Sequence, residues 1–201
     1  LFDFGQNIAG IIELDFTAKG GEELIITCGE LLDKDGNLTL KNIQCSNKKK
    51  TTPLQRIKYK AKKGRNKWSM SFSVFGFQYA LVMGDIELKE NEIKAVAVYS
   101  DLERTGWFES SNELLDKFVE ATVWSTKGNS LDIPTDCPTR ERHGWTGDAQ
   151  IFYNTASYLF DYNTFSKKYM ADVFDWQKKD GKLPQIAPYG GVDFYMSCMD
   201  G

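Results

Sequence analysis

The pattern of apolar and polar residues changes near residue 105. Before that point, apolar residues recur in short runs that alternate with polar residues, which is the period of a β-strand. Short strands at this spacing indicate an antiparallel β-sandwich. The expected strands are residues 11–17, 24–30, 54–60, 68–75, 77–82 and 93–99, and one face of strand 68–75 should carry Trp68, Met70, Phe72 and Val74.

After residue 105 the apolar spacing is helical. Ser110 and Glu113 have capping-box spacing, so we expect a helix that Ser110 caps and that ends at Gly128. Its apolar face should consist of Leu114, Leu115, Phe118, Val119 and Val123. A second helix is expected over about 147–160 and a third after Asn163, ending before residue 181.

The two periods together predict an α+β fold whose parts are segregated along the chain. We expect an antiparallel β-sandwich domain over residues 1–103 and a helical domain over residues 104–201. Three helices with broad apolar faces should be the first part of a larger helical domain. Because the chain also starts at Leu1 and enters at once into a strand-like pattern, we expect it to be a piece of a longer protein.

Composition places the chain among globular proteins, with 201 residues, 41% hydrophobic and 26% charged. No apolar run approaches the roughly 20 residues that a membrane span needs, so no membrane partner is expected. No signal peptide opens the chain, which favours a cytoplasmic location. This absence carries little weight in a chain expected to lack its native start.

Charge is divided unevenly between the two halves. Residues 1–100 hold 15 Lys and Arg against 12 Asp and Glu, whereas residues 101–201 hold 10 against 16. The basic excess clusters at Lys48–Lys50 and Lys58–Lys67. A nucleic-acid surface is one interpretation, but turns and solvated strand faces carry such lysines routinely, so no nucleic-acid partner is expected.

The sequence favours neither a metal nor a cofactor. The chain has one histidine, and its four cysteines are scattered without a C-x-x-C pair, which makes a zinc site improbable. Residues 33–37 resemble part of a calcium loop, but the glycine stands at the wrong position and Gln44 replaces the required Glu, so a turn is expected. The cysteines are Cys28, Cys45, Cys137 and Cys198.

Polar residues concentrate between the first two expected helices, in the stretch DCPTRERHGWTGDAQ at 136–150. The stretch holds three carboxylates, two arginines, the single histidine and a tryptophan. Pro134 and Pro138 should keep it in an extended or turning loop, and Gly144 and Gly147 permit sharp turns. Long ordered loops between helices tend to be functional, so the concentration calls for a chemical explanation.

Each of these residues also has a structural interpretation. Asp148 would favour a helix N-terminus, and the arginines Arg140 and Arg142 could form surface ion pairs with Asp136 and Glu141. Trp145 could belong to a core, and His143 could be structural. A Cys137–His143 thiol dyad is a weaker alternative, because no orienting group is evident.

As a group, the carboxylates Asp136, Glu141 and Asp148 beside Trp145 have the composition of a sugar site. Carboxylates bind hydroxyl groups, and an aromatic ring covers the apolar face of a sugar. Hydrolysis of a glycosidic bond needs one carboxylic acid to protonate the leaving oxygen and a second carboxylate at the anomeric carbon. Like charges in one pocket help an acid to retain its proton.

The stretch DCPTRERHGWTGDAQ resembles the signature of bacterial α-L-rhamnosidases, glycoside hydrolase family 78. DFGQNIAG at 3–10, GELLDKDGNL at 29–38 and FSVFGFQYALV at 72–82 resemble the β-domain that precedes the catalytic domain in that family. RTGWFESSNELLDKF at 104–118 resembles the junction into the helices. The resemblance covers nearly the whole chain in the right order.

The resemblance implies a catalytic (α/α)₆ barrel, of which residues 104–201 would be the beginning, and inverting hydrolysis of terminal α-L-rhamnose. It implies that Glu141 is the general acid and that rhamnose is bound by Asp136, Arg140, Trp145 and Asp148. Thr139 and His143 depart from the usual Gln and Leu, which affects subsite preference. The family's general base is a later glutamate, and Asp193 and Asp200 lie too early in the barrel for that role.

The sequence therefore predicts a piece of an α-L-rhamnosidase that acts on a rhamnose-containing glycoside or polysaccharide without a cofactor. One alternative is a non-catalytic carbohydrate-binding or structural β-domain with a helical appendage, although such a module would not need the carboxylate trio. Another is a helical-barrel glycosidase for a different sugar. The sequence leaves the aglycone, the linkage and the oligomeric state open.

Overall fold

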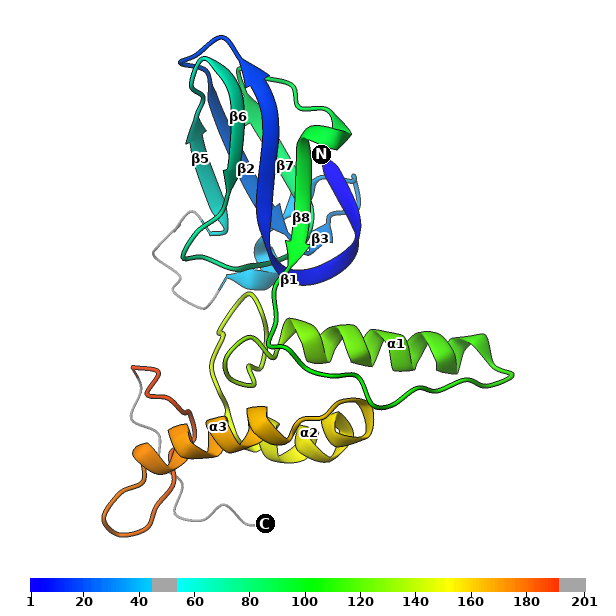
Figure 1. Cartoon of the computed structure of the whole chain (residues 1–201), viewed down its shortest axis with the longest axis vertical. Coiled ribbons are helices and arrows are strands. Elements are labelled where there is room, and N and C mark those ends of the chain that lie inside the picture. The colour runs from blue at the N-terminus through cyan, green and yellow to red at the C-terminus, as the bar shows by residue number, and fades with distance from the viewer. Residues whose placement is uncertain (45–53, 192–201) are drawn as a thin grey trace. The chain divides into compact units, whose positions relative to one another are not determined.

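The computed structural model describes residues 1–44 and 54–191 (Figure 1). The chain divides into two compact units, Leu1–Val98 and Tyr99–Gly201. The first contains all the strands and the second all the α-helices of the described residues, which confirms the predicted α+β fold. Residues of the sequence analysis that lie outside the described ranges are Cys45, Lys48–Lys50, Asp193, Cys198 and Asp200.

The first unit is an antiparallel sheet of six strands in the order β5-β2-β7-β1-β6, with β8 paired to β1. The strands are β1 (Phe2–Ala18), β2 (Glu23–Gly29), β5 (Arg56–Lys60), β6 (Gly64–Ser69), β7 (Phe75–Gly84) and β8 (Ile93–Ala97). A separate two-stranded sheet joins β3 (Leu31–Leu32) to β4 (Leu38–Thr39), and two short 3₁₀ turns cover Lys41–Ile43 and Glu90–Glu92.

The six-stranded sheet curls until its opposite edges meet. Tyr59 of β5 packs its ring 5.4 Å from that of Trp68 on β6 and 5.9 Å from that of Phe16 on β1. Its hydroxyl donates to Oδ1 of the fully buried Asn66, also on β6, at 3.0 Å. The curl therefore encloses a core that includes Ile12, Leu14, Leu24, Ile26 and Phe77.

The predicted strand 68–75 is wrong. β6 ends at Ser69, and β7 begins only at Phe75. Phe72 adopts a positive φ of 63° and is fully exposed, at 107%, whereas Met70 is buried. The alternation of apolar and polar residues therefore continues in the sequence across a turn. No strand forms there, because the left-handed backbone of Phe72 interrupts the extended conformation that a strand requires.

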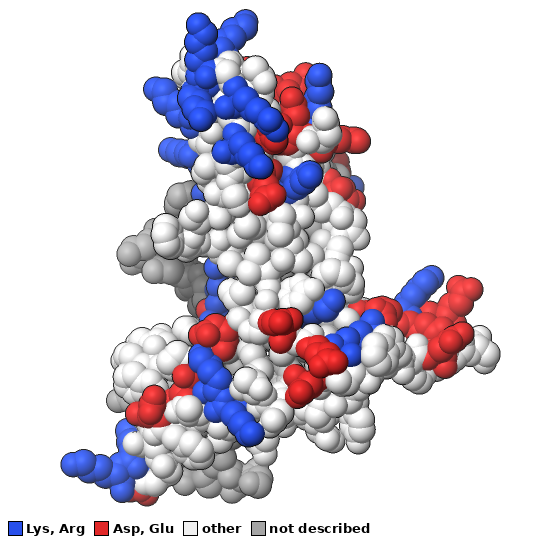
Figure 2. Space-filling model, viewed as in Figure 1, with Lys and Arg blue, Asp and Glu red and all other residues white. Residues whose placement is uncertain are grey.

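The basic cluster of residues 58–67 lies on solvated faces. In β5 the charged residues Arg56, Lys58 and Lys60 are exposed and Ile57 between them is buried. Figure 2 shows Lys and Arg side chains gathered over the end of the sheet where β5 and β6 lie. Residues 33–37 form the expected turn, in which Oδ1 of Asp33 accepts the backbone N–H groups of Asp35 and Asn37, both at 2.9 Å.

The second unit contains α1 (Glu113–Gly128), α2 (Thr146–Leu159) and α3 (Asn163–Asp175). The three predicted helices are present, but Ser110 is not the cap of the first. Asn112 caps α1 by accepting the N–H of Leu114 at 3.0 Å. The hydroxyl of Ser110 instead accepts the N–H of Asn112 at 3.1 Å, so the cap lies two residues later than predicted.

The helical unit has two buried clusters. One contains Leu102, Val123, Ala156, Leu159, Phe160, Tyr162 and Phe165, and the other contains Ala149, Tyr169, Val173 and Ala187. The predicted apolar face of α1 contributes little to them. Leu114 is 74% exposed and Phe118 68%, whereas Val123 is buried. Most of that face is therefore open to solvent.

Candidate active site

The polar stretch is an ordered loop between α1 and α2 that closes on itself. Asp136 and His143 pair as in a short antiparallel ladder, because the N–H of Asp136 donates to the carbonyl of His143 at 3.1 Å. The N–H of His143 donates to Oδ1 of Asp136 at 3.0 Å. The residues between them, 137–142, form a tight loop segment, which we call the excursion, and within it Arg142 takes a left-handed φ of 57°. The Asp136 carboxylate therefore fixes the end of the excursion that carries Glu141.

Glu141 is held at both carboxylate oxygens. Oε1 contacts the guanidinium of Arg140, and Oε2 accepts the indole N–H of Trp145 at 3.2 Å. Its backbone N–H contacts Sγ of Cys137 at 3.1 Å. The Glu141 side chain is 24% exposed, so it is reachable from solvent while its orientation is restrained. The structure thus brings Arg140, Glu141 and Trp145 together.

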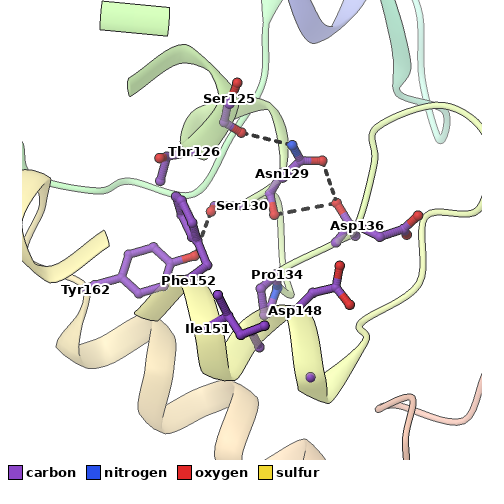
Figure 3. A pocket seen from close by; sticks show the side chains of 13 residues that line it. Ser125, Thr126, Asn129, Ser130, Pro134, Asp136, Asp148, Ile151, Phe152 and Tyr162 are labelled. Carbon is purple, nitrogen blue, oxygen red and sulfur yellow. Dashed lines mark hydrogen bonds between the residues drawn. The ribbon is translucent and has the colours of Figure 1, made fainter. Parts of the chain in front are cut away.

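Asp136 and Asp148 line a cavity of about 560 Å³ beside this group. Figure 3 shows their carboxylates on the same side of the cavity, with Asn129, Phe152 and Tyr162 among the other lining residues. Asp148 lies in the first turn of α2, where the helix dipole favours a negative charge. Glu141 does not line this cavity, so the described site has two adjoining parts.

Backbone contacts with residues 183–190 hold the end of the loop. The carbonyl of Gly144 accepts the N–H of Ala187 at 3.0 Å, and the N–H of Thr146 donates to Gln185 at 2.9 Å. Trp145 and Ile186 form an isolated β-bridge. Reasoning from sequence missed this segment, because its loop-like composition gives no sign of which residues it will contact.

His143 and Cys137, the residues of the alternative thiol dyad, have different neighbours. The His143 ring meets Trp145 edge-on, with centroids 6.5 Å apart, and lies against the backbone of Gly190. Cys137 instead contacts the Glu141 backbone. The geometry supports structural roles for both in ordering the loop.

Two buried tyrosines, Tyr162 and Tyr169, and the partly buried Tyr153 pack in the helical unit. Burial raises the pKa of Tyr162 to about 12, although Ser130 opposes the shift through a hydrogen bond of 2.8 Å. Burial also raises the pKa of Tyr153 and Tyr169, and nearby Asp172 adds to both shifts. These hydroxyls therefore keep their protons at neutral pH. Over residues 1–44 and 54–191, no group of three or more His, Cys, Asp or Glu is placed to hold a metal ion.

Family models match both units of the chain. Residues 1–99 match the concanavalin-like domain of bacterial α-L-rhamnosidases, and residues 103–198 match their 6 hairpin glycosidase domain. The chain belongs to the bacterial α-L-rhamnosidase family. The site loop falls within the second of these matches.

Two curated relatives of this rhamnosidase-family chain are α-L-rhamnosidases. The protein of Formosa agariphila is 36% identical over 194 residues, covering 94% of this chain and 20% of the relative. That of Alteromonas sp. is 33% identical over 193 residues, covering 94% and 20% respectively. The chain thus spans about a fifth of the length of the curated relatives it matches. Among its described residues, no helix is both long and apolar enough to cross a membrane.

Solved rhamnosidase structures contain the same fold. The α-L-rhamnosidase from Dictyoglumus thermophilum superposes with a TM-score of 0.84 at 34% identity, covering 92% of this chain and 21% of that one. The Streptomyces avermitilis enzyme, complexed with L-rhamnose, gives a TM-score of 0.85 at 28% identity, covering 95% and 18%. Both units of the chain therefore have the fold of rhamnosidase domains.

Proposed function

We propose that this chain supplies the β-domain and the first helices of the catalytic barrel of an α-L-rhamnosidase. The reaction is hydrolysis of terminal α-L-rhamnose from a rhamnoside with inversion, and Glu141 is its general acid. The observation that carries the proposal is that one ordered loop holds both Glu141, which Arg140 and Trp145 restrain, and Asp136, which lines a cavity together with Asp148. The family match supports the choice of substrate.

The general acid must reach the glycosidic oxygen. In the structure, Arg140 and Trp145 occupy the two oxygens of the Glu141 carboxylate. Substrate binding should therefore release Glu141 from Arg140, so that Oε1 takes up a proton from solvent and then donates it to the glycosidic oxygen, while the Trp145 indole still holds Oε2. Arg140, half exposed, is then available for a sugar hydroxyl.

Asp136, Arg140, Trp145 and Asp148 are the proposed rhamnose-binding residues. Ionised carboxylates accept hydrogen bonds from neighbouring hydroxyls of a sugar, and the Trp145 ring offers an apolar surface. An inverting glycosidase also needs a base about 6.5–9.5 Å from the acid, with a water between them. We assign that base to the part of the enzyme that follows residue 201.

The proposed domain boundary lies at residue 103, with the β-domain over 1–103 and the beginning of the catalytic domain over 104–201. Two compact units that divide after Val98 support two domains. Residues 99–103 pack with the helices. Leu102 is buried among α1 and α2 residues, and the N–H of Ser100 donates to the carbonyl of Ser130 at 2.7 Å. These residues act as the connector.

The test is Glu141→Gln in an enzyme that carries this sequence together with the rest of the relatives' length. Loss of a general acid should lower kcat by about 10²–10⁴-fold. The loss should be smaller for a nitrophenyl rhamnoside than for a disaccharide, because an activated leaving group needs little protonation. The matched control is Glu109→Gln, an exposed glutamate outside the loop, which should retain full activity. Equal losses on both substrates would contradict the assignment of the acid.

A further inference from the structure

We propose that Tyr169 is the positioning residue of the site loop. Its hydroxyl, carried by α3, donates to the backbone carbonyl of Gly144 at 2.7 Å. Gly144 stands three residues after Glu141 and directly before Trp145, the residue whose indole restrains the Glu141 carboxylate. A single buried side chain thus ties the acid-bearing loop to the third helix.

Two donors support the loop backbone at Gly144. Gly144 follows His143, which closes the Asp136–His143 pairing, so it is the first residue beyond the excursion that holds Glu141. Its carbonyl accepts two hydrogen bonds, from Tyr169 and from the N–H of Ala187. The second donor belongs to a loop, whereas the first is anchored in a helix. The Tyr169 hydroxyl is therefore the more rigid of the two.

Tyr169 itself has little freedom to move. It is 1% exposed and packs with Ala149, Val173 and Ala187. Its ring meets that of Tyr153 edge-on, with centroids 6.4 Å apart. A Cβ on Gly144 would lie 3.1 Å from Cε2 of Tyr169, so the ring and the loop backbone are in direct contact.

The Tyr169 ring also lies close to the part of the site that contains Asp148. Ala149, which follows Asp148 in α2, shares its buried cluster with Tyr169. The charge of Asp148 also helps to raise the pKa of the Tyr169 hydroxyl, after burial and Asp172. Tyr169 therefore contacts the chain on both sides of Trp145 and fixes the spacing between the Glu141 excursion and the start of α2.

The first experiment uses the 201-residue chain and does not depend on catalysis. Hydrogen exchange is compared between Tyr169→Phe and Tyr59→Phe, a matched variant that loses a tyrosine hydrogen bond of 3.0 Å within the sheet. Phe keeps the packed ring, and Ala187 still satisfies the Gly144 carbonyl. We expect amides of residues 136–146 to exchange about fivefold faster in Tyr169→Phe alone, as loss of one buried hydrogen bond predicts. Unchanged exchange in this loop would overturn the proposal.

A measurement on the unsubstituted chain covers the case in which Tyr169→Phe does not fold. A hydroxyl proton bonded to the Gly144 carbonyl should exchange slowly and give an NMR cross-peak to the backbone N–H of Ala187, which donates to the same oxygen. Such a cross-peak supports the proposal. A Tyr169 hydroxyl proton that exchanges rapidly and gives no such cross-peak would overturn the proposal, as would unchanged hydrogen exchange in residues 136–146.

The catalytic consequence rests on the proposed function and is tested in the full-length enzyme. Displacing Glu141 should lower kcat about tenfold for an alkyl rhamnoside and less for a nitrophenyl rhamnoside, with KM nearly unchanged. A role in stability alone would lower activity on both substrates equally, and Tyr59→Phe should alter neither. If the unsubstituted enzyme cleaves no rhamnoside, the proposed function fails, whereas the exchange result on residues 136–146 still decides whether Tyr169 positions the loop.

Discussion

Gly144 is the residue of the site loop with the least room for a side chain. A Cβ at this position would lie 2.2 Å from the carbonyl oxygen of Ala187 and 3.1 Å from both Ile133 and Tyr169. The oxygen belongs to a backbone, which cannot rotate away as a flexible side chain can. Glycine is required here by close approach of two segments.

Gly144→Ala should therefore destabilise the helical unit by about 1–3 kcal/mol, the usual cost of overpacking. Gly147→Ala is the matched control, because a Cβ there meets nothing within 4 Å. Gly147 lies in the first turn of α2, so alanine should be neutral or stabilise by up to about 1 kcal/mol. Urea denaturation followed by circular dichroism compares the two. Similar free energies of unfolding for both variants would show that the loop can move away from residues 183–190.

Among the three α-helices, α1 is the most amphipathic in sequence and the least buried in structure. Its apolar residues Leu114, Leu115 and Phe118 are exposed, and so are Trp107 and Phe108 in the segment before it. Exposed apolar surface of this extent favours association. We define these five residues as the α1 apolar patch.

We expect the 201-residue chain to self-associate through the α1 apolar patch. Phe118→Lys should shift the sedimentation profile toward the monomer at micromolar concentrations, because it replaces an exposed apolar side chain of the patch with a charged one. Glu113→Gln, which changes net charge by the same amount outside the patch, should leave the profile unchanged. A chain that is already monomeric at these concentrations would contradict the expectation.

The elements differ in how well the sequence predicts them, for physical reasons. Helices α2 and α3 begin and end close to the predicted residues, because a 3.6-residue period and flanking loop residues are local signals. The strand predicted at 68–75 fails at Phe72, where a left-handed turn interrupts an alternation that continues in sequence.

The contacts that form the site are likewise of two kinds: contacts between residues close in sequence, which can be predicted, and contacts between residues far apart, which cannot. The composition of residues 136–148 identifies the loop, and the pairing of Glu141 with Arg140 and Trp145 lies within it. The support from Tyr169 does not follow from the sequence, because a tyrosine 25 positions away on a helix has the same apolar spacing as any core residue. Tertiary contacts of this kind become visible only in the folded chain.

At the scale of the whole molecule, tyrosines with raised pKa values should make the free energy of unfolding decrease at alkaline pH. The pKa of Tyr162 rises to about 12, and those of Tyr153 and Tyr169 are raised as well, in each case chiefly by burial. An unfolded tyrosine has a pKa near 10. The stabilising contribution is therefore fully present below about pH 10 and is lost as pH rises through the folded pKa values.

We expect the helical unit to unfold cooperatively above about pH 10, with tyrosinate absorbance of these residues appearing together with the loss of helical circular dichroism. Both signals are measured in one alkaline titration. Tyr162→Phe should reduce the amplitude of the coupled absorbance change. Full tyrosinate absorbance while the helical signal persists would mean that these hydroxyls are accessible in the folded chain.

A further expectation at this scale is that the 201-residue chain alone has no measurable rhamnosidase activity. It contains the proposed acid but not the proposed base, and the acid cannot activate a water on the opposite face of the sugar. The assay incubates the chain with an aryl α-L-rhamnoside beside its Glu141→Gln variant. Turnover that is present in the unsubstituted chain and absent in the variant would place the base within these residues.

The pairing of β1 has a consequence for synthesis on the ribosome. β1 lies at the start of the sequence, and its partners are β6, β7 and β8, of which the last ends at Ala97. At about 5–20 residues per second, β1 waits roughly 4–16 seconds after leaving the ribosome before its last partner is made. In the first part of that interval, before β6 is made, its apolar residues and backbone hydrogen-bonding groups have no native strand to pair with. Nascent β1 is therefore a segment to which we expect a chaperone that binds extended apolar peptides to bind.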